Sequence, residues 1–287
     1  MLTKKAKRTI GCIVAGCVLA AGIAFSVVAC DMSMETTSYR LETPKVTAPV
    51  RIVFISDLHN SLFGEGQKEL VSAVEQAQPD IVILGGDIAD KTQDYSPDNA
   101  YILAEYLGKK YPCYYSIGNH EYARGDSELI KERLSQYGIT TLEGNSDIIE
   151  VKGQKIEVCG IFGADTLLEI DGRTISELEL VSTDKATEHY RMLLLHFPED
   201  AEKCLDGNFD LILSGHAHGG QWRIPGVLDG VFAPGQGLFP KYTSGIYSFD
   251  NTKLLVSRGL WKPSTVIAVP RVFNRPEFII ADIVPEG

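Results

Sequence analysis

Five short apolar runs, each with aspartate, asparagine or histidine at its carboxyl end, constrain this chain more than any other feature of its sequence. Stretches with the apolar spacing of amphipathic helices lie between most of them, so strands and helices alternate along the chain. Such alternation predicts an α/β fold with parallel strands joined by right-handed crossovers. The apolar runs cover residues 50–56, 80–86, 112–118, 190–197 and 209–215.

The segments around these strands complete the predicted fold. Helices are expected over 66–78, 98–108, 126–137, 176–188 and 198–205. The alternation of strands and helices is interrupted after Gly138. Residues 148–163 are typical of a β-hairpin that turns at Lys152-Gly153-Gln154. Beyond Gly220, short strands are expected near 244–249, 253–257 and 277–283. We therefore predict one α/β domain over residues 49–287, with mixed sheets and helices outside them.

Side chains that can bind a metal follow all five strands. Ligands of open α/β sheets bind beyond the carboxyl ends of the strands, so these groups should meet at one edge. A cap, a turn or a hydrogen-bonded core histidine explains any single one of them. Such roles explain the whole set poorly, because uncompensated carboxylates and imidazoles packed together cost several kcal/mol per group. The groups are Asp57 and His59, then Asp87, then Asn119, His120 and Glu121, then His196, and finally His216 and His218.

A pair of divalent cations would remove this cost. Two carboxylates, one asparagine carbonyl and four imidazoles form a mixed nitrogen and oxygen set, which suits Mn, Fe or Zn and differs from a thiolate-rich structural zinc site. One carboxylate can bridge two ions about 3.5 to 4 Å apart, and such a pair clamps the attacking and leaving oxygens of a phosphoryl displacement. We therefore expect two divalent metal ions and a phosphate-ester substrate.

The strand-end motifs resemble those of the calcineurin-like metallophosphoesterase family, whose ordered pattern is D-x-H, GD, GNH-[DE], H and GH-x-H. Here they read DLH at 57–59, GGD at 85–87, GNHE at 118–121, His196 and GHAH at 215–218. The resemblance covers about residues 50 to 220. The tail segments VSRGL and PRVFNRPE also resemble the bacterial membrane-anchored phosphodiesterase branch. The resemblance implies a four-layer α/β/β/α sandwich with two mixed sheets.

Carried over position by position, the resemblance assigns a role to each motif residue. One metal would be held by Asp57, His59 and His218, the other by Asn119, His196 and His216, with Asp87 bridging them. A hydroxide bridging the two ions would attack phosphorus in line. His120 would steady the transition state or protonate the leaving oxygen, and Glu121 would orient it.

Other polar residues leave alternatives open. Asp90 stands where purple acid phosphatases carry a tyrosine, which disfavours their iron site; it supports a ligand or forms a turn, with the turn slightly favoured. Four arginines either bind phosphate or form structural ion pairs, with ion pairs favoured: Arg124, Arg258, Arg271 and Arg275. Trp222 and Trp261 cover a pocket or, as we favour, pack.

The first thirty residues differ in kind from the rest. Lys4, Lys5, Lys7 and Arg8 precede an uncharged run from Thr9 to Cys30, which is about 20 residues and long enough to span a bilayer. Uncleaved, residues 1–30 are an anchor whose basic end stays in the cytoplasm. Alternatively, VVAC at 27–30 resembles a lipobox with Cys30 as the lipidated residue. Both interpretations place the domain outside the cytoplasmic membrane, after a linker over 31–48.

Charge and cysteine content argue against a nucleic-acid-binding protein and against a disulfide-stabilised fold. The formal net charge of −11 argues against nucleic acid as a partner, because binding phosphates generally needs a basic surface. Cys113, Cys159 and Cys204 are odd in number and lack CxxC spacing, so they indicate buried thiols and no disulfide framework.

These observations favour a membrane-tethered phosphoesterase of the cell envelope. A diester is favoured over a monoester because His120 is available to protonate a poor leaving group. Location alone suggests envelope polymers or lipid-linked phosphates as substrates. A first alternative is a pyrophosphatase acting on a nucleotide-linked lipid precursor such as UDP-2,3-diacylglucosamine, which would require a cytoplasmic domain. A second is a non-catalytic metal-binding scaffold, which would be expected to have lost ligands.

Overall fold

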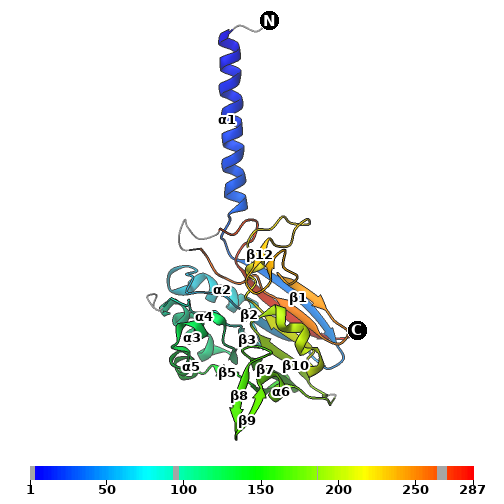
Figure 1. The fold of residues 1–287 in the computed structure, drawn as a ribbon. Helices are drawn as coiled ribbons and strands as arrows, with labels where there is room; N and C mark the ends of the chain where they lie inside the picture. Colours follow the sequence, from blue (N-terminus) through cyan, green and yellow to red (C-terminus); the bar gives the residue numbers. More distant parts are fainter. Residues whose placement is uncertain (1–3, 93–96, 186, 264–269) are drawn as a thin grey trace.

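Two six-stranded sheets form the centre of the molecule, and a long N-terminal helix stands away from them (Figure 1). The computed structural model describes residues 4–92, 97–185, 187–263 and 270–287. The first sheet has the strand order β1-β16-β2-β3-β4-β5, in which the pair β16 and β2 is antiparallel and the other pairs are parallel. Its strands are β1 (Glu35–Thr43), β16 (Glu277–Pro285), β2 (Val50–Ile55), β3 (Ile81–Leu84), β4 (Cys113–Tyr115) and β5 (Thr140–Thr141).

The second sheet has the order β14-β15-β11-β10-β7-β6, with parallel strands at its centre and an antiparallel pair at each edge. The predicted hairpin is confirmed at one edge, where Lys152 and Gly153 both have positive φ, as a two-residue type I′ turn requires. The strands are β14 (Gly245–Ser248), β15 (Lys253–Val256), β11 (Leu211–Ser214), β10 (Tyr190–Leu195), β7 (Gln154–Ile161) and β6 (Asn145–Val151).

The strands are apolar on both faces because each sheet is covered on both sides. In β2, Ile52 and Phe54 pack between the two sheets, whereas Val53 and Ile55 pack under the helices. The first sheet is covered by α2 (Lys68–Ala77), α3 (Asp98–Lys110) and α5 (Ser127–Gln136). The outer face of the second sheet carries α6 (Glu177–Val181) and the 3-10 helix η2 (Pro198–Gly207). The expected α/β sandwich with two mixed sheets is confirmed.

The helix expected over 176–188 is wrong over most of its length. A hairpin of β8 (Leu167–Ile170) and β9 (Arg173–Ser176) comes first, and the helix α6 ends at Val181, while residue 186 lies outside the described residues. Leu178 and Val181 pack on the core, but no large apolar residue follows them in the sequence before the next strand to bury a further turn. The short helix α4 (Asn119–Arg124), in contrast, was not predicted.

The expected linker over 31–48 contains the edge strand β1, so that prediction is also wrong. Residues 35 to 43 pair with β16 along nine residues in parallel. Leu41 is 1% exposed and belongs to the core between the sheets. The pairing covers the edge of β16, which would otherwise expose a row of unpaired backbone groups.

The N-terminal segment forms the helix α1 (Lys4–Ala29), of which Arg8–Ala29 is long and apolar enough to cross a membrane by length and composition. Cys113, Cys159 and Cys204 are buried free thiols, as expected.

Candidate metal centre

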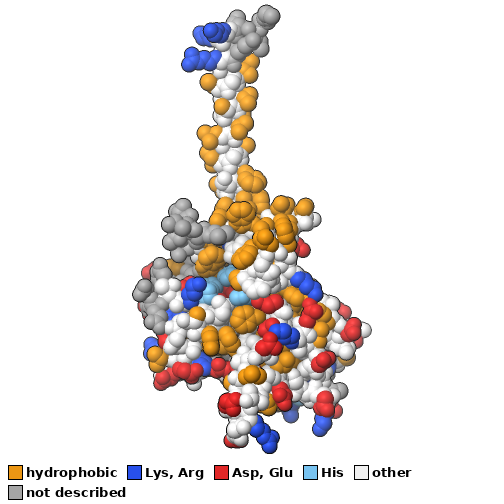
Figure 2. All heavy atoms as spheres, in the orientation of Figure 1, with side chains coloured by type: hydrophobic (Ala, Val, Ile, Leu, Met, Phe, Trp, Pro, Cys, Tyr) orange, Lys and Arg blue, Asp and Glu red, His pale blue; other side chains and the backbone are white. Residues whose placement is uncertain are grey.

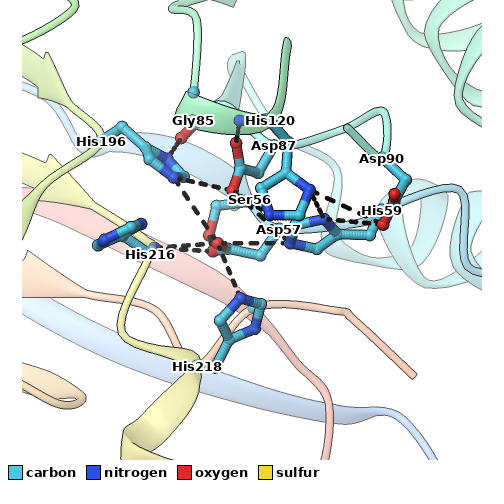
Figure 3. A network of polar contacts seen from close by, with 12 residues as sticks. Ser56, Asp57, His59, Gly85, Asp87, Asp90, His120, His196, His216 and His218 are labelled. Atoms are coloured by element: carbon cyan, nitrogen blue, oxygen red, sulfur yellow. Dashed lines mark hydrogen bonds and ion pairs between the residues drawn. The ribbon is translucent and has the colours of Figure 1, made fainter. Parts of the chain in front are cut away.

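The ends of five strands bring the predicted site residues together at one edge of the sandwich (Figure 3). The parallel neighbours β2 and β3 lead into the loops that carry Asp57 and His59, then Asp87, and β4 leads to His120 in the first turn of α4. The parallel neighbours β10 and β11 lead to the histidines of the second sheet, His196, His216 and His218. The site therefore lies where the carboxyl ends of the two facing sheets meet, as such sheets favour.

Left-handed backbone marks five of these residues. Their φ angles are positive, although residues other than glycine rarely adopt this region, and each such residue costs about 1–3 kcal/mol. The residues are Asp57 (φ 49°), His59 (φ 44°), Asp87 (φ 52°), His216 (φ 63°) and His218 (φ 47°). This strain is concentrated in the loops that aim the side chains at one another.

The glycines of two motifs make room for the carboxylates. A Cβ atom at Gly118 would overlap the carboxylate of Asp87, and one at Gly215 would overlap that of Asp57. The glycines of GNH and GHAH therefore follow from close packing, because a side chain before Asn119 or before His216 would displace Asp87 or Asp57.

The two aspartates are buried and held by hydrogen bonds. Asp57 accepts from Ser56 Oγ at 2.6 Å and from the backbone N–H of His216 at 2.9 Å, and burial raises its pKa to about 6. Asp87 accepts from the backbone N–H of His120 at 2.7 Å. Burial opposes ionisation of Asp87, but the neighbouring imidazoles, led by His196, hold its pKa well below its usual value.

The potential ligand atoms of the described residues form three groups, in each of which three ligand atoms lie within 4.8 Å of one another. Two groups are fully buried: Asp57, His59 and His218, and Asp87, His196 and His216. The third, His59, Asp90 and His120, is only partly buried. Asp87 Oδ2 lies 3.2 Å from His196 Nε2 and 3.7 Å from His59 Nε2, so it faces both buried groups. Asn119 Oδ1 is buried without a hydrogen-bond partner.

Hydrogen bonds at one ring nitrogen leave the other nitrogen bare. His196 Nδ1 donates to the carbonyl of Gly85 at 2.8 Å, so the neutral form of this ring has its lone pair on Nε2, which lies 3.2 Å from Asp87 Oδ2. The backbone N–H of Lys91 donates to His120 Nδ1, so His120 Nδ1 is an acceptor. His59 Nδ1 lies 3.1 Å from His120 Nδ1 and must therefore be the donor of the hydrogen bond between the two rings. His59 Nε2 then also carries a lone pair, and neither Nε2 atom has a partner. Buried bare nitrogens with bonded second nitrogens fit metal-binding histidines.

Burial also favours the neutral imidazoles that metals require. It lowers the pKa of His59 and of His216 to about 3. Burial would lower the pKa of His196 as well, but Asp87 and Asp57 raise it to about 10. A positive charge beside Asp87 is thus strongly favoured, which is also what a divalent cation supplies.

His120 is more accessible than the candidate ligands, and it carries its proton on Nε2, whereas His59 and His196 carry theirs on Nδ1. Its side chain is 18% exposed, and because Nδ1 accepts hydrogen bonds, Nε2 carries the proton, 3.9 Å from Asp87 Oδ2. Asp90 Oδ2 lies 3.7 Å from His120 Nδ1 and 3.8 Å from His59 Nδ1, while Asp90 Oδ1 accepts from the N–H of Thr92. Asp90 therefore forms a turn and also adjoins the paired rings.

Glu121 holds the loop of Asp87. Its carboxylate is fully buried and accepts from the backbone N–H groups of Asp87, Ala89 and Gly118 at 2.8–3.0 Å. Burial raises the pKa of Glu121 to about 7. Through Asp87, which receives the N–H of His120, Glu121 acts on the backbone that carries His120.

All four candidate arginines make structural contacts. Arg124 pairs with Asp126 at 2.9 Å, Arg258 pairs with Glu35 and Glu277 at 2.9 Å, and Arg275 pairs with Asp31 at 3.2 Å. The fully buried Arg271 donates to the carbonyls of Arg258 and Gly259.

The two tryptophans differ. The ring of Trp261 lies 5.2 Å from that of His218 and 6.3 Å from that of His59, at the rim of the site. Trp222 is 47% exposed and is therefore not a core residue.

Two supporting residues of the site were missed in the sequence. Asn274 Nδ2 donates to the carbonyls of His218 at 2.7 Å and Gln221 at 3.0 Å, and it thereby positions the GHAH loop. A Cβ atom at Gly259 would overlap Asp57. The tail segments VSRGL and PRVFNRPE contain these two residues and were the signal that could have identified them.

Comparisons with known proteins agree with this geometry. The model of the calcineurin-like phosphoesterase family matches residues 50–220. A metallophosphoesterase of Campylobacter jejuni is 28% identical over 87% of this chain, which spans 63% of that relative. Phosphodiesterase YaeI of Escherichia coli is 30% identical over 74% of this chain and 76% of its own length.

Among solved structures, phosphopantetheinyl hydrolase of Mycobacterium tuberculosis overlaps 79% of this chain and 96% of its own, with a TM-score of 0.46 and 15% identity. The family model confirms the expected resemblance and, at the level of the family, the expectation of a phosphoric ester hydrolase. The chain belongs to the calcineurin-like phosphoesterase family.

Proposed function

We propose that this protein is a phosphodiesterase that uses two divalent metal ions and is tethered to a membrane by its N-terminal segment. The observation that carries the proposal is the pair of ligand groups that share Asp87 between them. The bare, buried Nε2 atoms of His59 and His196 support it, because an unpaired polar atom in a protein interior is costly unless it binds something.

Each group would hold one ion. Asp57, His59 and His218 would hold the first ion, Asn119, His196 and His216 would hold the second, and Asp87, which faces both groups, would serve both ions. When bound, the ions supply Lewis-acid chemistry, which neutralises charge on the phosphoryl group and activates water as the nucleophile. The mixed nitrogen and oxygen donors suit Mn, Zn or Fe.

His120 would act on the leaving group. Hydrolysis forms a bond from a water oxygen to phosphorus and breaks the bond to the ester oxygen, which must gain a proton. The Nε2–H of His120 is partly accessible and lies beside Asp87. Burial lowers the pKa of His120, so the imidazolium, protonated at Nδ1 as well, would give up its Nε2 proton readily to the leaving oxygen and return to the neutral ring. A proton donor matters most for the poor leaving group of a diester, so a diester is the favoured substrate.

The N-terminal segment would place this chemistry at a membrane. Lys4 and Lys5 begin α1, and basic residues remain on the cytoplasmic side, so the domain would lie outside. Lipidation of Cys30 after removal of α1 would leave the domain on the same side. Mass spectrometry of the mature N-terminus distinguishes these two forms.

The catalytic assignment is tested with His120→Asn in the full-length protein loaded with Mn, Zn or Fe. We expect turnover of bis(p-nitrophenyl) phosphate to fall by about 10²- to 10⁴-fold while both ions are retained. His189→Asn is the matched control, because His189 pairs with Glu157 at 3.0 Å outside the site. Undiminished turnover by His120→Asn with both ions bound would show the assignment to be wrong, and inactivity of the wild type with every metal would favour a scaffold.

A further inference from the structure

The chain that follows the GHAH motif carries a concentrated set of exposed apolar side chains. We call residues 222–239 the apolar loop; it includes the hairpin of β12 (Phe232–Ala233) and β13 (Gly237–Leu238). Of the fourteen large apolar side chains that are exposed outside α1 in the described part of the chain, six lie in these 18 residues. They are Trp222 (47% exposed), Ile224 (53%), Val227 (81%), Phe232 (46%), Leu238 (68%) and Phe239 (69%).

This loop lies at the base of α1. Figure 1 places β12 where α1 meets the domain, and Figure 2 shows apolar side chains gathered there, with histidine side chains visible just below them. Contacts connect the two regions. The rings of Phe25 in α1 and Phe273 lie 5.5 Å apart, and Arg223 N–H donates to the carbonyl of Val272 at 2.9 Å. Trp222 and Val272 form a parallel bridge.

The contact between Phe25 and Phe273 shows which turn of α1 lies beside the domain. The apolar part of the helix, Arg8–Ala29, has 22 residues. Its length is about 33 Å, close to the roughly 30 Å of a hydrocarbon core, so its last turn reaches the membrane boundary when the helix spans the bilayer. Phe25 lies one turn before Ala29, and Phe273 therefore lies at that boundary together with Trp222 and the apolar loop.

The composition and backbone of the loop suit a membrane boundary. Its only charged residues are Arg223 and Asp229, which lie 3.9 Å apart. Trp222 donates its Nε1–H to the carbonyl of Pro270, and tryptophan favours the interface between lipid and water, while phenylalanine and leucine are typical of the apolar face of interfacial segments. Phe239 in the loop and Phe273, which contacts Phe25 of α1, have positive φ angles of 53° and 50°, a strained conformation for bulky residues.

We propose that the apolar loop inserts its side chains into the surface of the bilayer that holds α1, and that the site acts on a phosphate ester carried by a lipid headgroup. The inference rests on the proposed phosphoesterase function and membrane tether. Trp222 follows His218 by four residue steps, which span at most about 14 Å, so a membrane-bound Trp222 keeps the metal centre near the headgroups.

Tryptophan quenching tests the insertion. Full-length Trp261→Phe, in vesicles of phosphatidylcholine and phosphatidylglycerol, leaves Trp222 as the single tryptophan. We expect brominated phosphatidylcholine to quench its emission and aqueous iodide to have little effect. In the matched variant Trp222→Phe, Trp261 lies against the imidazoles of the site, and brominated lipid should not quench it. Quenching of Trp222 by iodide alone would refute insertion. Quenching by neither would also refute it and would indicate a protein cover, such as a second copy.

A second experiment tests the substrate class. The triple variant Val227→Ser, Leu238→Ser, Phe239→Ser should lose about tenfold or more of its turnover of phosphatidylglycerol in vesicles. Its turnover of soluble bis(p-nitrophenyl) phosphate should stay unchanged, because these side chains are 68–81% exposed and lie outside the metal centre. The control Ile102→Ser, Leu129→Ser, Leu167→Ser changes exposed apolar residues elsewhere and should match the wild type on both substrates.

Equal vesicle turnover by the triple variant and the wild type would overturn the inference. A wild type that hydrolyses the soluble diester but no vesicle lipid would overturn the lipid substrate and leave the proposed function intact. A wild type inactive on both would overturn the proposed function, and the quenching result would still decide the insertion.

Discussion

The two ends of β10 carry buried polar clusters that are completed in different ways. At its start, Arg191 is 2% exposed and donates to Glu157 at 2.7 Å and to the carbonyl of Gly207 at 2.8 Å. Just beyond its end, His196 is 1% exposed and faces Asp87, but its Nε2 has no hydrogen-bond partner. Burial and charge are common to both clusters. Only the cluster at His196 also has unpaired ligand atoms that face a common centre. These unpaired atoms, and not buried charge, therefore identify the site.

Removing the shared carboxylate should have the largest effect. Asp87→Asn takes away the negative charge that faces both ligand groups, and we expect both ions to be lost with a fall in turnover of about 10³-fold or more. Metal analysis and diester turnover measure this. Asp210→Asn is the control at the other end of β10, where Asp210 accepts from Arg191 N–H, and it should keep both ions. Retention of both ions by Asp87→Asn would exclude a bridging role.

Disrupting the Arg191 cluster at the start of β10 should lower stability and leave metal binding unchanged. Arg191→Met leaves Glu157 without its main partner, and we expect the free energy of unfolding to fall by about 3 kcal/mol. Denaturant titration measures this loss. Metal content per folded molecule should equal that of the wild type, and a change in metal content would mean that the two ends of β10 are coupled.

The two histidines of GHAH should separate the two ion sites. His216 groups with Asp87 and His196, whereas His218 groups with Asp57 and His59. His216→Asn and His218→Asn are each expected to lose one ion and to weaken its binding by about 10- to 100-fold or more. Metal titration with spectroscopically distinct ions shows which site is lost. Loss of the same ion in both variants would contradict the assignment.

A single methyl group near Asp87 should have the smallest effect. Gly118→Ala adds a Cβ atom that would overlap both Asp87 Oδ1 and the backbone nitrogen of Asp87, while the backbone angles of residue 118 stay allowed, since φ is −105°. We expect metal affinity to fall by about tenfold through displacement of that carboxylate. Gly153→Ala is a contrasting control in the turn between β6 and β7, where the space is open, and it should affect stability alone. Unchanged metal affinity in Gly118→Ala would show that the carboxylate can move without cost.

The accuracy of the predicted fold depended on how each segment buries its side chains. Runs such as 50–56 and 209–215 were predictable because central strands are apolar on both faces. The edge strand β1 was not, because its alternating polar residues resemble a linker, and its partner β16 lies some 240 residues away in the chain. The helix predicted over 176–188 failed because its second half has no apolar face to bury.

The sequence by itself determined which ligand-type residues exist, their order, and their positions after strands, because motif spacing and strand burial are local properties. Only the tertiary structure decided that Asp87 faces both ligand groups and that Gly85 and His120 leave bare nitrogens on His196 and His59. It also decided that the apolar loop lies beside α1. These relations join segments far apart in the chain, and their distances depend on how the two sheets and the tail pack against one another.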